Sequence, residues 1–240
     1  MYPAAPASTS LDRDRARAIV AEVTHWHHKF EVFPGVVTPG SYDPGFLLEK
    51  LQLPKDMAGL KVLDIGPSDG FFSMNMARRG ARVTVVDYRA KNVHGFGAME
   101  QLTALDFDYR QMNLYDIPAS DIGAFDIVLF LGVLYHLPDM VRALNIVAGL
   151  CQGRLLVETE FAPALMPGVA VAQYYEAASL AGDITNFWVP NRDCLFAMVR
   201  DVGFKIDRID SWGTRILVDA SPGRTAKTEK MAYAYGLLPG

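Results

Sequence analysis

A glycine-containing stretch near residue 66 has the residue types of a ligand-binding loop. Asp64 and Gly66 end a short apolar run, and Gly70 follows immediately before Phe71. Glycine lets the backbone turn tightly and lets a ligand lie against it, beside the free N–H groups of a helix N-terminus. Asp69 disfavours a bound phosphate, and no further glycine stands at the spacing of a pyrophosphate-binding loop. Taken alone, the stretch also fits a plain turn between a strand and a helix.

A second acid follows at a spacing suited to ribose recognition. Asp87 ends the apolar segment 82–87, 17 residues after Gly70, and Tyr88 comes next. An acid at the end of the second strand accepts hydrogen bonds from both ribose hydroxyls. A cofactor that contains adenosine but no phosphate fits the loop and the acid together, and S-adenosylmethionine is such a molecule. The residues that we expect to contact it here are Asp64, Gly66, Asp69, Gly70, Phe71, Asp87 and Tyr88. The carboxylate of Asp64 could order the loop or meet a cationic amino group.

Tyr135 and His136 are candidate catalytic residues, and His136 is the first candidate for acid–base catalysis. It follows the apolar segment 125–131, and a neutral imidazole near pH 7 accepts a proton from an attacking hydroxyl or amine. Substrate positioning and helix capping are the alternative roles. His28 is the second candidate, if it lies in a helical cap over the pocket. The three histidines within residues 25–28 also suggest a metal, but no carboxylate or cysteine stands at matching spacing, and we expect no metal there.

Two further groups of side chains are candidates for substrate contacts. Glu158 and Glu160 alternate along an expected strand end, where they could bind Mg²⁺ together with a diol substrate. Aromatic and polar residues outside the expected sheet could wall a substrate pocket, namely Trp26, Tyr42, Tyr175, Trp188 and Asn191. Each aromatic residue of this set could equally seal the flanking segments onto the sheet.

Strand-like and helix-like segments alternate through the centre of the chain. Strands are expected at 61–66, 82–87, 109–114, 125–131 and 155–158, with helices between them. Segments 205–209 and 214–218 are too close for a helical crossover, which predicts an antiparallel pair. The expected fold is α/β, a seven-stranded doubly wound (Rossmann-like) sheet with an antiparallel final hairpin and an N-terminal helical cap.

The domain organisation follows from this alternation. We expect residues 1–60 to form the helical cap, and residues 61–220 to form the cofactor-binding core with a cap insertion at 160–191. Residues 221–240 are expected to form a C-terminal tail.

Composition and charge limit the class of protein. The 240 residues are 50% hydrophobic and 21% charged, which is typical of one large folded domain. A net charge of −4 argues against nucleic acid as a partner and favours a small-molecule acceptor. No apolar run approaches the roughly 20 residues that cross a bilayer, and residues 1–10 do not resemble a signal peptide. Cys151 and Cys194 have neither the spacing of a disulfide framework nor that of a metal site, so we expect a cytoplasmic protein. We also expect a monomer or homodimer.

The loop and its following acid resemble the nucleotide-binding loop of class I S-adenosylmethionine-dependent methyltransferases, and the likeness extends from about Trp26 to Val218. Residues 132–137 (Gly-Val-Leu-Tyr-His-Leu), Glu158-Thr159 and residues 186–191 are similar to segments of the tRNA wobble-uridine carboxymethyltransferase and its smaller bacterial relatives. The basic residue that the tRNA enzyme uses for the extra carboxylate of its donor has no clear counterpart, which favours ordinary methyl transfer.

This resemblance implies a cofactor, a reaction and further site residues. Asn113 and Leu114 should flank the adenine of S-adenosylmethionine, and Leu131 and Gly132 should border its methionine part. The implied reaction is methyl transfer to an oxygen or nitrogen of a small molecule, such as a sugar or natural product. A tRNA wobble-uridine (carboxy)methyl-transferring enzyme and a non-catalytic S-adenosylmethionine-binding protein stay open as alternatives. The acidic loop disfavours a NAD-dependent oxidoreductase.

Overall fold

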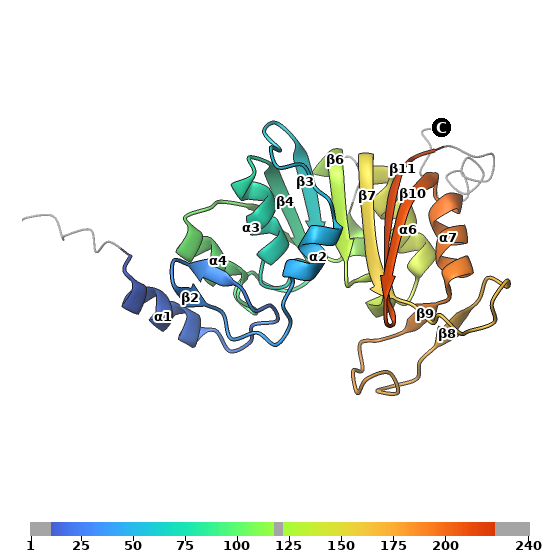
Figure 1. Ribbon diagram of the computed structural model, residues 1–240, viewed down its shortest axis with the longest axis horizontal. Helices are drawn as coiled ribbons and strands as arrows, with labels where there is room; N and C mark the ends of the chain where they lie inside the picture. Colours follow the sequence, from blue (N-terminus) through green and yellow to red (C-terminus); the bar gives the residue numbers. More distant parts are fainter. Residues whose placement is uncertain (1–10, 118–121, 224–240) are drawn as a thin grey trace, which may run out of the picture.

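A seven-stranded sheet lies at the centre of the part of the chain that the structure describes, residues 11–117 and 122–223 of a computed structural model (Figure 1). The parallel strands are β3 (Lys61–Ile65), β4 (Arg82–Asp87), β5 (Asp108–Gln111), β6 (Phe125–Leu131) and β7 (Cys151–Glu160). The strand order is β10-β11-β7-β6-β3-β4-β5, and β11 (Arg215–Pro222) runs antiparallel between β7 and β10 (Phe204–Trp212). The expected α/β class and the antiparallel final hairpin are confirmed.

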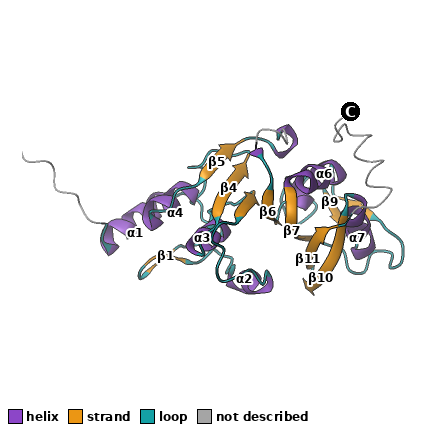
Figure 2. Cartoon of the chain, turned by 90° about the horizontal axis from the view of Figure 1, so that it is seen from above, coloured by secondary structure: helices purple, strands orange, loops and turns teal. Residues whose placement is uncertain are grey.

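Helices cover both faces of this sheet, and each face has its own apolar core (Figure 2). Val62 packs in the core beneath α3 (Phe71–Arg78) and α4 (Phe96–Thr103). Its neighbour Leu63 packs in the opposite core, beneath α6 (Met140–Leu150) and α7 (Arg192–Asp201). Successive side chains of a strand point to opposite faces, so strands buried on both sides are apolar throughout. This burial explains why the core strands are visible in the sequence.

The N-terminal segment differs from the expected helical cap. It contains α1 (Arg13–Glu22), a hairpin of β1 (Glu31–Phe33) and β2 (Val36–Val37), and α2 (Gly45–Lys50). Residues 23–30 contain no helix, so His28 does not lie in a helix of this segment. The missed signal is Pro34-Gly35 between residues that favour strands, and Gly35 has the left-handed φ of +73° that this turn requires.

The insertion after β7 lies below the sheet in Figure 1, at the edge where β7 ends. It carries β8 (Ala172–Tyr174), paired antiparallel with β9 (Trp188–Pro190). Residues 224–240 of the expected C-terminal tail lie outside the described residues. The same holds for residues 1–10, on which the expectation about a signal peptide was based. No helix within the described ranges is long and apolar enough to span a membrane.

Two arginines hold the C-terminal end of α2 against the sheet. Arg154 donates to the carbonyl of Leu51 at 2.7 Å, and Arg208 donates to the carbonyl of Lys50 at 2.6 Å. Both arginines also pair with the buried carboxylate of Asp219, at 2.5 and 3.3 Å. The last carbonyls of a helix lack intrahelical partners, so these guanidinium groups satisfy them and fix the helix in place.

Replacing Arg154 with methionine should lower the free energy of unfolding by about 3 kcal/mol, because the change leaves the buried carboxylate of Asp219 with one partner fewer. Urea denaturation measures this difference. The matched control is Arg17→Met, since Arg17 pairs with Asp14 at the surface and should contribute less than about 1 kcal/mol. Equal losses in the two variants would contradict the role given to Arg154.

Candidate functional site

The loop between β3 and α3 makes a tight turn close to its neighbours. Gly66, Ser68 and Gly70 all have left-handed backbone, with φ of +68°, +56° and +82°. A Cβ at Gly66 would lie 2.7 Å from Cγ2 of Val133, and a Cβ at Gly70 would lie 2.3 Å from Cε of Met99. Both glycines are therefore required by conformation and by packing. Ser68 adopts the same strained region with a side chain, a feature that clusters at functional sites.

Asp64 orders the start of α3. Its carboxylate accepts a hydrogen bond of 2.6 Å from the hydroxyl of Ser73, and both residues are buried. Burial raises the pKa of Asp64 to about 6, and the hydrogen bond from Ser73 opposes this rise. Of the two roles considered for Asp64, ordering of the loop is the one with a contact in the structure.

The carboxylate of Asp69 binds the N-terminal segment. The backbone N–H groups of His27 and His28 donate to its Oδ2 at 3.0 and 2.7 Å, and Nδ1 of His28 contacts its Oδ1. Asp69 is fully buried, so these partners satisfy a charge that would otherwise be costly. The expectations of Asp69 as a direct cofactor ligand and of His28 as a base in a helix are therefore corrected. Both residues position the loop.

Asp87 lies beside this loop, as the parallel pairing of β3 and β4 requires. The N–H of Gly66 donates to the carbonyl of Val86 at 2.9 Å, which brings the loop and the next residue, Asp87, together. Oδ1 of Asp87 accepts the N–H of Arg89 at 2.9 Å, and burial raises the pKa of the carboxyl. Tyr88 is largely exposed and packs its ring on the Arg89 guanidinium.

The remaining cofactor candidates occupy the same edge with different degrees of exposure. Phe71 is buried against Phe30, with ring centroids 5.2 Å apart. Asn113 accepts the N–H of Tyr115 at 3.0 Å and so caps the short helix η1 (Leu114–Asp116), in which Leu114 is buried. Leu131 and Gly132, at the end of β6, are partly exposed. The amide N–H₂ of Asn113 is a further donor.

His136 ends the short helix η2 (Leu134–His136) and has a defined tautomer. Its Nδ1 lies 3.2 Å from the carbonyl oxygen and 3.0 Å from the hydroxyl oxygen of Thr185. That hydroxyl donates its own hydrogen to Asp183 at 2.7 Å, so both Thr185 oxygens are acceptors and Nδ1 carries the proton. Nε2 therefore keeps its lone pair. Burial lowers the pKa of His136, which favours the neutral form of the ring.

A guanidinium group that the sequence analysis did not single out lies next to Tyr135. Arg215 donates to both oxygens of Glu158 at 2.5 Å and to Glu160 at 3.2 Å, and it stacks 4.9 Å from the centre of the Tyr135 ring. Because the two carboxylates hold a guanidinium, they are not arranged for Mg²⁺. Across the described residues, no three His, Cys, Asp or Glu side chains form a group that could hold a metal. Arg215 pairs with Glu160 across β11 and β7, a contact between distant residues that no spacing in the sequence indicates.

Two of the expected substrate contacts are structural instead. The indole N–H of Trp26 donates to the carbonyl of Val20 at 3.0 Å, and the ring is buried. Asn191 is also buried. Its oxygen accepts the N–H of Cys194 at 2.8 Å, and its amide donates to the carbonyl of Val169 at 2.7 Å. Neither side chain is available to a ligand, which corrects both predictions.

The other three expected substrate contacts lie near the edge where β7 ends. Tyr42 is partly exposed, and burial followed by the charge of Glu158 raises its pKa. Trp188 donates its indole N–H to the carbonyl of Pro138 at 3.0 Å. Tyr175 lines a cavity of about 410 Å³ under the insertion.

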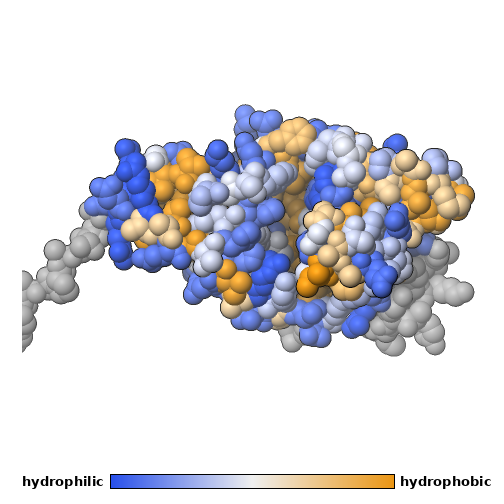
Figure 3. Space-filling model, turned by 90° about the horizontal axis from the view of Figure 1, so that it is seen from below, coloured by the Kyte–Doolittle hydropathy of each residue, from blue (hydrophilic) through white to orange (hydrophobic). Residues whose placement is uncertain are grey.

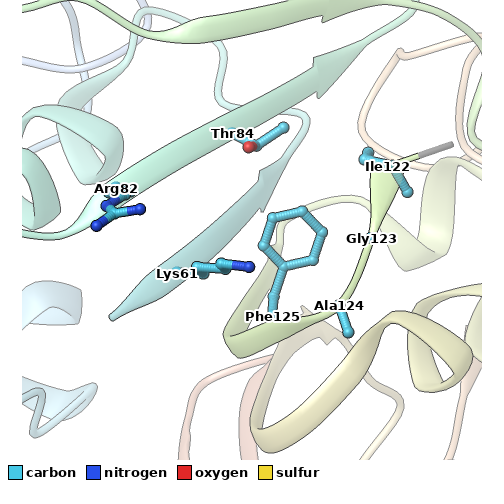
Figure 4. A pocket seen from close by; sticks show the side chains of 7 residues that line it. All are labelled: Lys61, Arg82, Thr84, Ile122, Gly123, Ala124 and Phe125. Carbon is cyan, nitrogen blue, oxygen red and sulfur yellow. The ribbon is translucent and has the colours of Figure 1, made fainter. Parts of the chain in front are cut away.

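A smaller cavity of about 190 Å³ lies at the opposite edge of the sheet, where Lys61 and Arg82 begin β3 and β4 (Figure 4). Ligands of open α/β sheets bind outside the carboxyl ends of the strands, so the candidate site is at the other edge. Figure 3, seen from below, shows separate hydrophobic and hydrophilic patches on the molecular surface rather than one continuous apolar face.

Comparison with known proteins supports the fold and the class. Residues 63–153 match the model of the methyltransferase domain family. The chain is 28% identical over 203 residues to a ubiquinone biosynthesis O-methyltransferase of Xanthomonas euvesicatoria pv. vesicatoria, covering 80% of this chain and 82% of the relative. A protein of the same name from Chromobacterium violaceum is 38% identical over 90 residues, covering 36% of this chain and 39% of that relative.

Two solved structures have the same fold. The N-terminal domain of EvdMO1 with SAH bound matches 91% of this chain and 99% of its own length, with a TM-score of 0.66 and 17% identity. The 1,6-didemethyltoxoflavin-N1-methyltransferase of Burkholderia thailandensis matches 75% of this chain and 76% of its own, with a TM-score of 0.56 and 17% identity. Together with the domain match over residues 63–153, these findings support an S-adenosylmethionine-dependent methyltransferase with a Rossmann-like fold. The similarity to the tRNA enzyme stays a prediction.

Replacing Asp69 with alanine should lower the free energy of unfolding by about 3 kcal/mol, because the N–H groups of His27 and His28 lose their buried acceptor. Urea denaturation measures the loss, and hydrogen exchange should show faster exchange at these two amides. The control is Asp56→Ala, which removes one exposed acceptor from Ala58. Unchanged exchange at residues 27 and 28 would contradict the positioning role.

Proposed function

We propose that this methyltransferase transfers the methyl group of S-adenosylmethionine to a hydroxyl oxygen of a small organic molecule. The observation that carries the proposal is the contact of His136 with Thr185, whose carbonyl and hydroxyl oxygens lie against Nδ1 and leave the lone pair of Nε2 available. Such a nitrogen is suited to accept the proton of an attacking hydroxyl. The names of the curated relatives, O-methyltransferases of ubiquinone biosynthesis, support oxygen over nitrogen as the acceptor atom.

The carboxyl edge of β3 and β4 fits the adenosyl part of the cofactor. Asp87 has an oxygen beyond its contact with Arg89, and it lies next to a loop whose close packing leaves no room for side chains at Gly66 and Gly70. Asp87 would accept hydrogen bonds from the ribose hydroxyls. Asn113 and Leu114 would flank the adenine, and Leu131 with Gly132 would border the methionine part. When bound, S-adenosylmethionine supplies an activated sulfonium methyl group.

The residues around His136 support its use as a base. Nε2 takes the acceptor's proton, and the resulting charge on the ring is stabilised by the carboxylate of Asp183 through the hydroxyl of Thr185. The ring of Tyr135 packs on the imidazole with centroids 4.1 Å apart, and Arg215 in turn stacks on Tyr135. These contacts restrict rotation of the imidazole. Holding acceptor and methyl group in line supplies much of the remaining rate enhancement.

The proposal is tested by offering the protein S-adenosylmethionine with separate acceptors: phenols, sugar hydroxyls, primary amines and unmodified tRNA. Formation of S-adenosylhomocysteine measures turnover, and mass spectrometry of the product locates the methyl group. We expect turnover with a hydroxyl acceptor. Turnover with tRNA alone, or with amines alone, would overturn the proposal and favour one of the competing reactions.

Replacing Asp87 with alanine should weaken binding of S-adenosylhomocysteine by roughly 10- to 100-fold, because hydrogen bonds to a charged group contribute about 1.5–3 kcal/mol. Titration calorimetry measures the dissociation constant. Asp108→Ala, at the opposite end of the neighbouring strand β5, is the matched control and should bind normally. An unchanged constant for the Asp87 variant would refute its role in ribose binding.

Replacing His136 with asparagine should lower kcat by roughly 10²- to 10⁴-fold, since the amide can keep the contact of Nδ1 with Thr185 but lacks Nε2. Binding of S-adenosylhomocysteine should change less than twofold. In the wild type, kcat/KM should rise with pH through a midpoint below the usual histidine pKa, because the base acts in its deprotonated form and burial lowers its pKa. The variant should lose this rise. Parallel losses of kcat and cofactor affinity would instead indicate a structural residue.

A further inference from the structure

We propose that the cavity under the insertion binds the acceptor, and that it selects an uncharged, mainly apolar molecule with a hydroxyl or other hydrogen-bond donor directed at Glu160. The inference rests on the proposed function and adds to it the chemical class of the substrate. The cavity has a volume of about 410 Å³, within the range of small-molecule sites.

The walls of this cavity come from three parts of the chain. They are the end of β7 with the residues that follow it, the insertion, and Thr214 in the turn between β10 and β11. Backbone hydrogen bonds join these parts, because the N–H of Phe161 donates to the carbonyl of Thr214 at 2.7 Å and the N–H of Ala162 donates to that of Pro190 at 3.0 Å. The cavity is therefore held by tertiary contacts, which favours a preformed site.

The side chains that line the cavity define the chemistry of its occupant. Most are apolar, among them Phe161, Leu180 and Val189. The polar members are Glu160, Gln173, Tyr175 and Thr214. Among the described lining residues none is basic, and the carboxylate of Glu160 is the formal charge. An anionic ligand would lose its hydration shell beside a carboxylate, whereas a neutral hydroxyl would gain an acceptor.

Glu160 retains accepting capacity despite its contact with Arg215. The guanidinium makes two hydrogen bonds of 2.5 Å to Glu158 but one of 3.2 Å to Glu160. Two carboxylates share one cation, so the group carries a formal charge of −1 and attracts a donor. The side chain of Glu160 is 24% exposed, compared with 3% for Glu158. Glu160 is thus the accessible carboxylate of the pair.

The cavity adjoins the proposed site of methyl transfer. The N–H of Gly132 donates to the carbonyl of Glu158 at 2.9 Å, two residues before Glu160. On the side of the insertion, the N–H of Phe187 donates to the carbonyl of Tyr135 at 2.9 Å, and the N–H of Tyr175 donates to the carbonyl of Phe187 at 2.8 Å. An acceptor in the cavity therefore lies beside the elements that carry Gly132 and His136.

The test uses two probes that differ in charge, methyl 3,4-dihydroxybenzoate and 3,4-dihydroxybenzoate. Titration calorimetry in the presence of S-adenosylhomocysteine measures their binding to the full chain at pH 7.5. We expect the neutral ester to bind at least tenfold more tightly than the anionic acid. Glu160→Gln keeps the shape of the side chain and removes its charge, so it should bring the two affinities within about threefold by improving binding of the acid.

Two variants fill the cavity, Leu180→Trp and Ala164→Trp, and each should weaken ester binding at least tenfold while S-adenosylhomocysteine binds within twofold of wild type. The matched control is Val169→Trp, which adds the same ring at an exposed position of the insertion that does not line the cavity. Circular dichroism and normal S-adenosylhomocysteine binding establish that each variant folds. Two filling variants are used so that the test still works if one of them does not fold.

The possible outcomes separate this inference from the proposed function. Ester binding that is insensitive to both filling variants, tighter binding of the acid by wild type, or binding of neither probe would overturn the cavity assignment. Methyl transfer to a hydroxyl acceptor that both filling variants leave unchanged would also overturn it, while the proposed function would stand. Cavity-dependent binding of the ester without methyl transfer to any hydroxyl acceptor would support the cavity and contradict the proposed function.

Discussion

The buried carboxylate of Asp69 is the interaction on which the architecture of the candidate site depends. It lies in the glycine turn after β3, and its described hydrogen-bond partners, His27 and His28, come from a segment 41 to 42 residues earlier in the chain. A carboxylate without partners would not be stable in this position, so the turn and the N-terminal segment stabilise each other. The same segment pairs with Tyr42, whose N–H donates to the carbonyl of His27 at 3.2 Å. Asp69 thus also determines how Tyr42 reaches the carboxyl edge.

The antiparallel strand β11 places the guanidinium group of Arg215 at the carboxyl edge of the parallel strands. In a fully parallel sheet the first residue of a strand lies at the edge opposite to the carboxyl ends. Because β11 runs against β7, its first residue, Arg215, pairs with Glu160, the last residue of β7. The guanidinium can therefore neutralise Glu158, which is almost fully buried, and support the ring of Tyr135. The final hairpin has a chemical consequence as well as a topological one.

The sequence predicted those parts of the structure that have a local signature. Strands buried on both faces are apolar throughout, and parallel topology alone brings the turn at Gly66 next to Asp87. The contacts that the sequence did not predict join residues that are far apart in the chain. Neither Asp69 with His28 nor Arg215 with Glu158 has a characteristic spacing, since the separations of 41 and 57 residues depend on how the whole chain folds. The prediction that Asn191 contacts the substrate failed for the same reason. Its amide donates to backbone carbonyls of the insertion, among them that of Val169.

The insertion links recognition of an acceptor to the state of the proposed base. Thr185 fixes the tautomer of His136, and two residues later Phe187 accepts the N–H of Tyr175, which lines the cavity. A shift of this segment that reshaped the cavity would therefore also move the groups that hold the proton on Nδ1. Closely packed contacts of this kind do not deform independently. Substitutions in the insertion should for this reason change the choice of acceptor and the orientation of the imidazole together, while the turn at Gly66 and the acid at Asp87, held by other contacts, stay as they are.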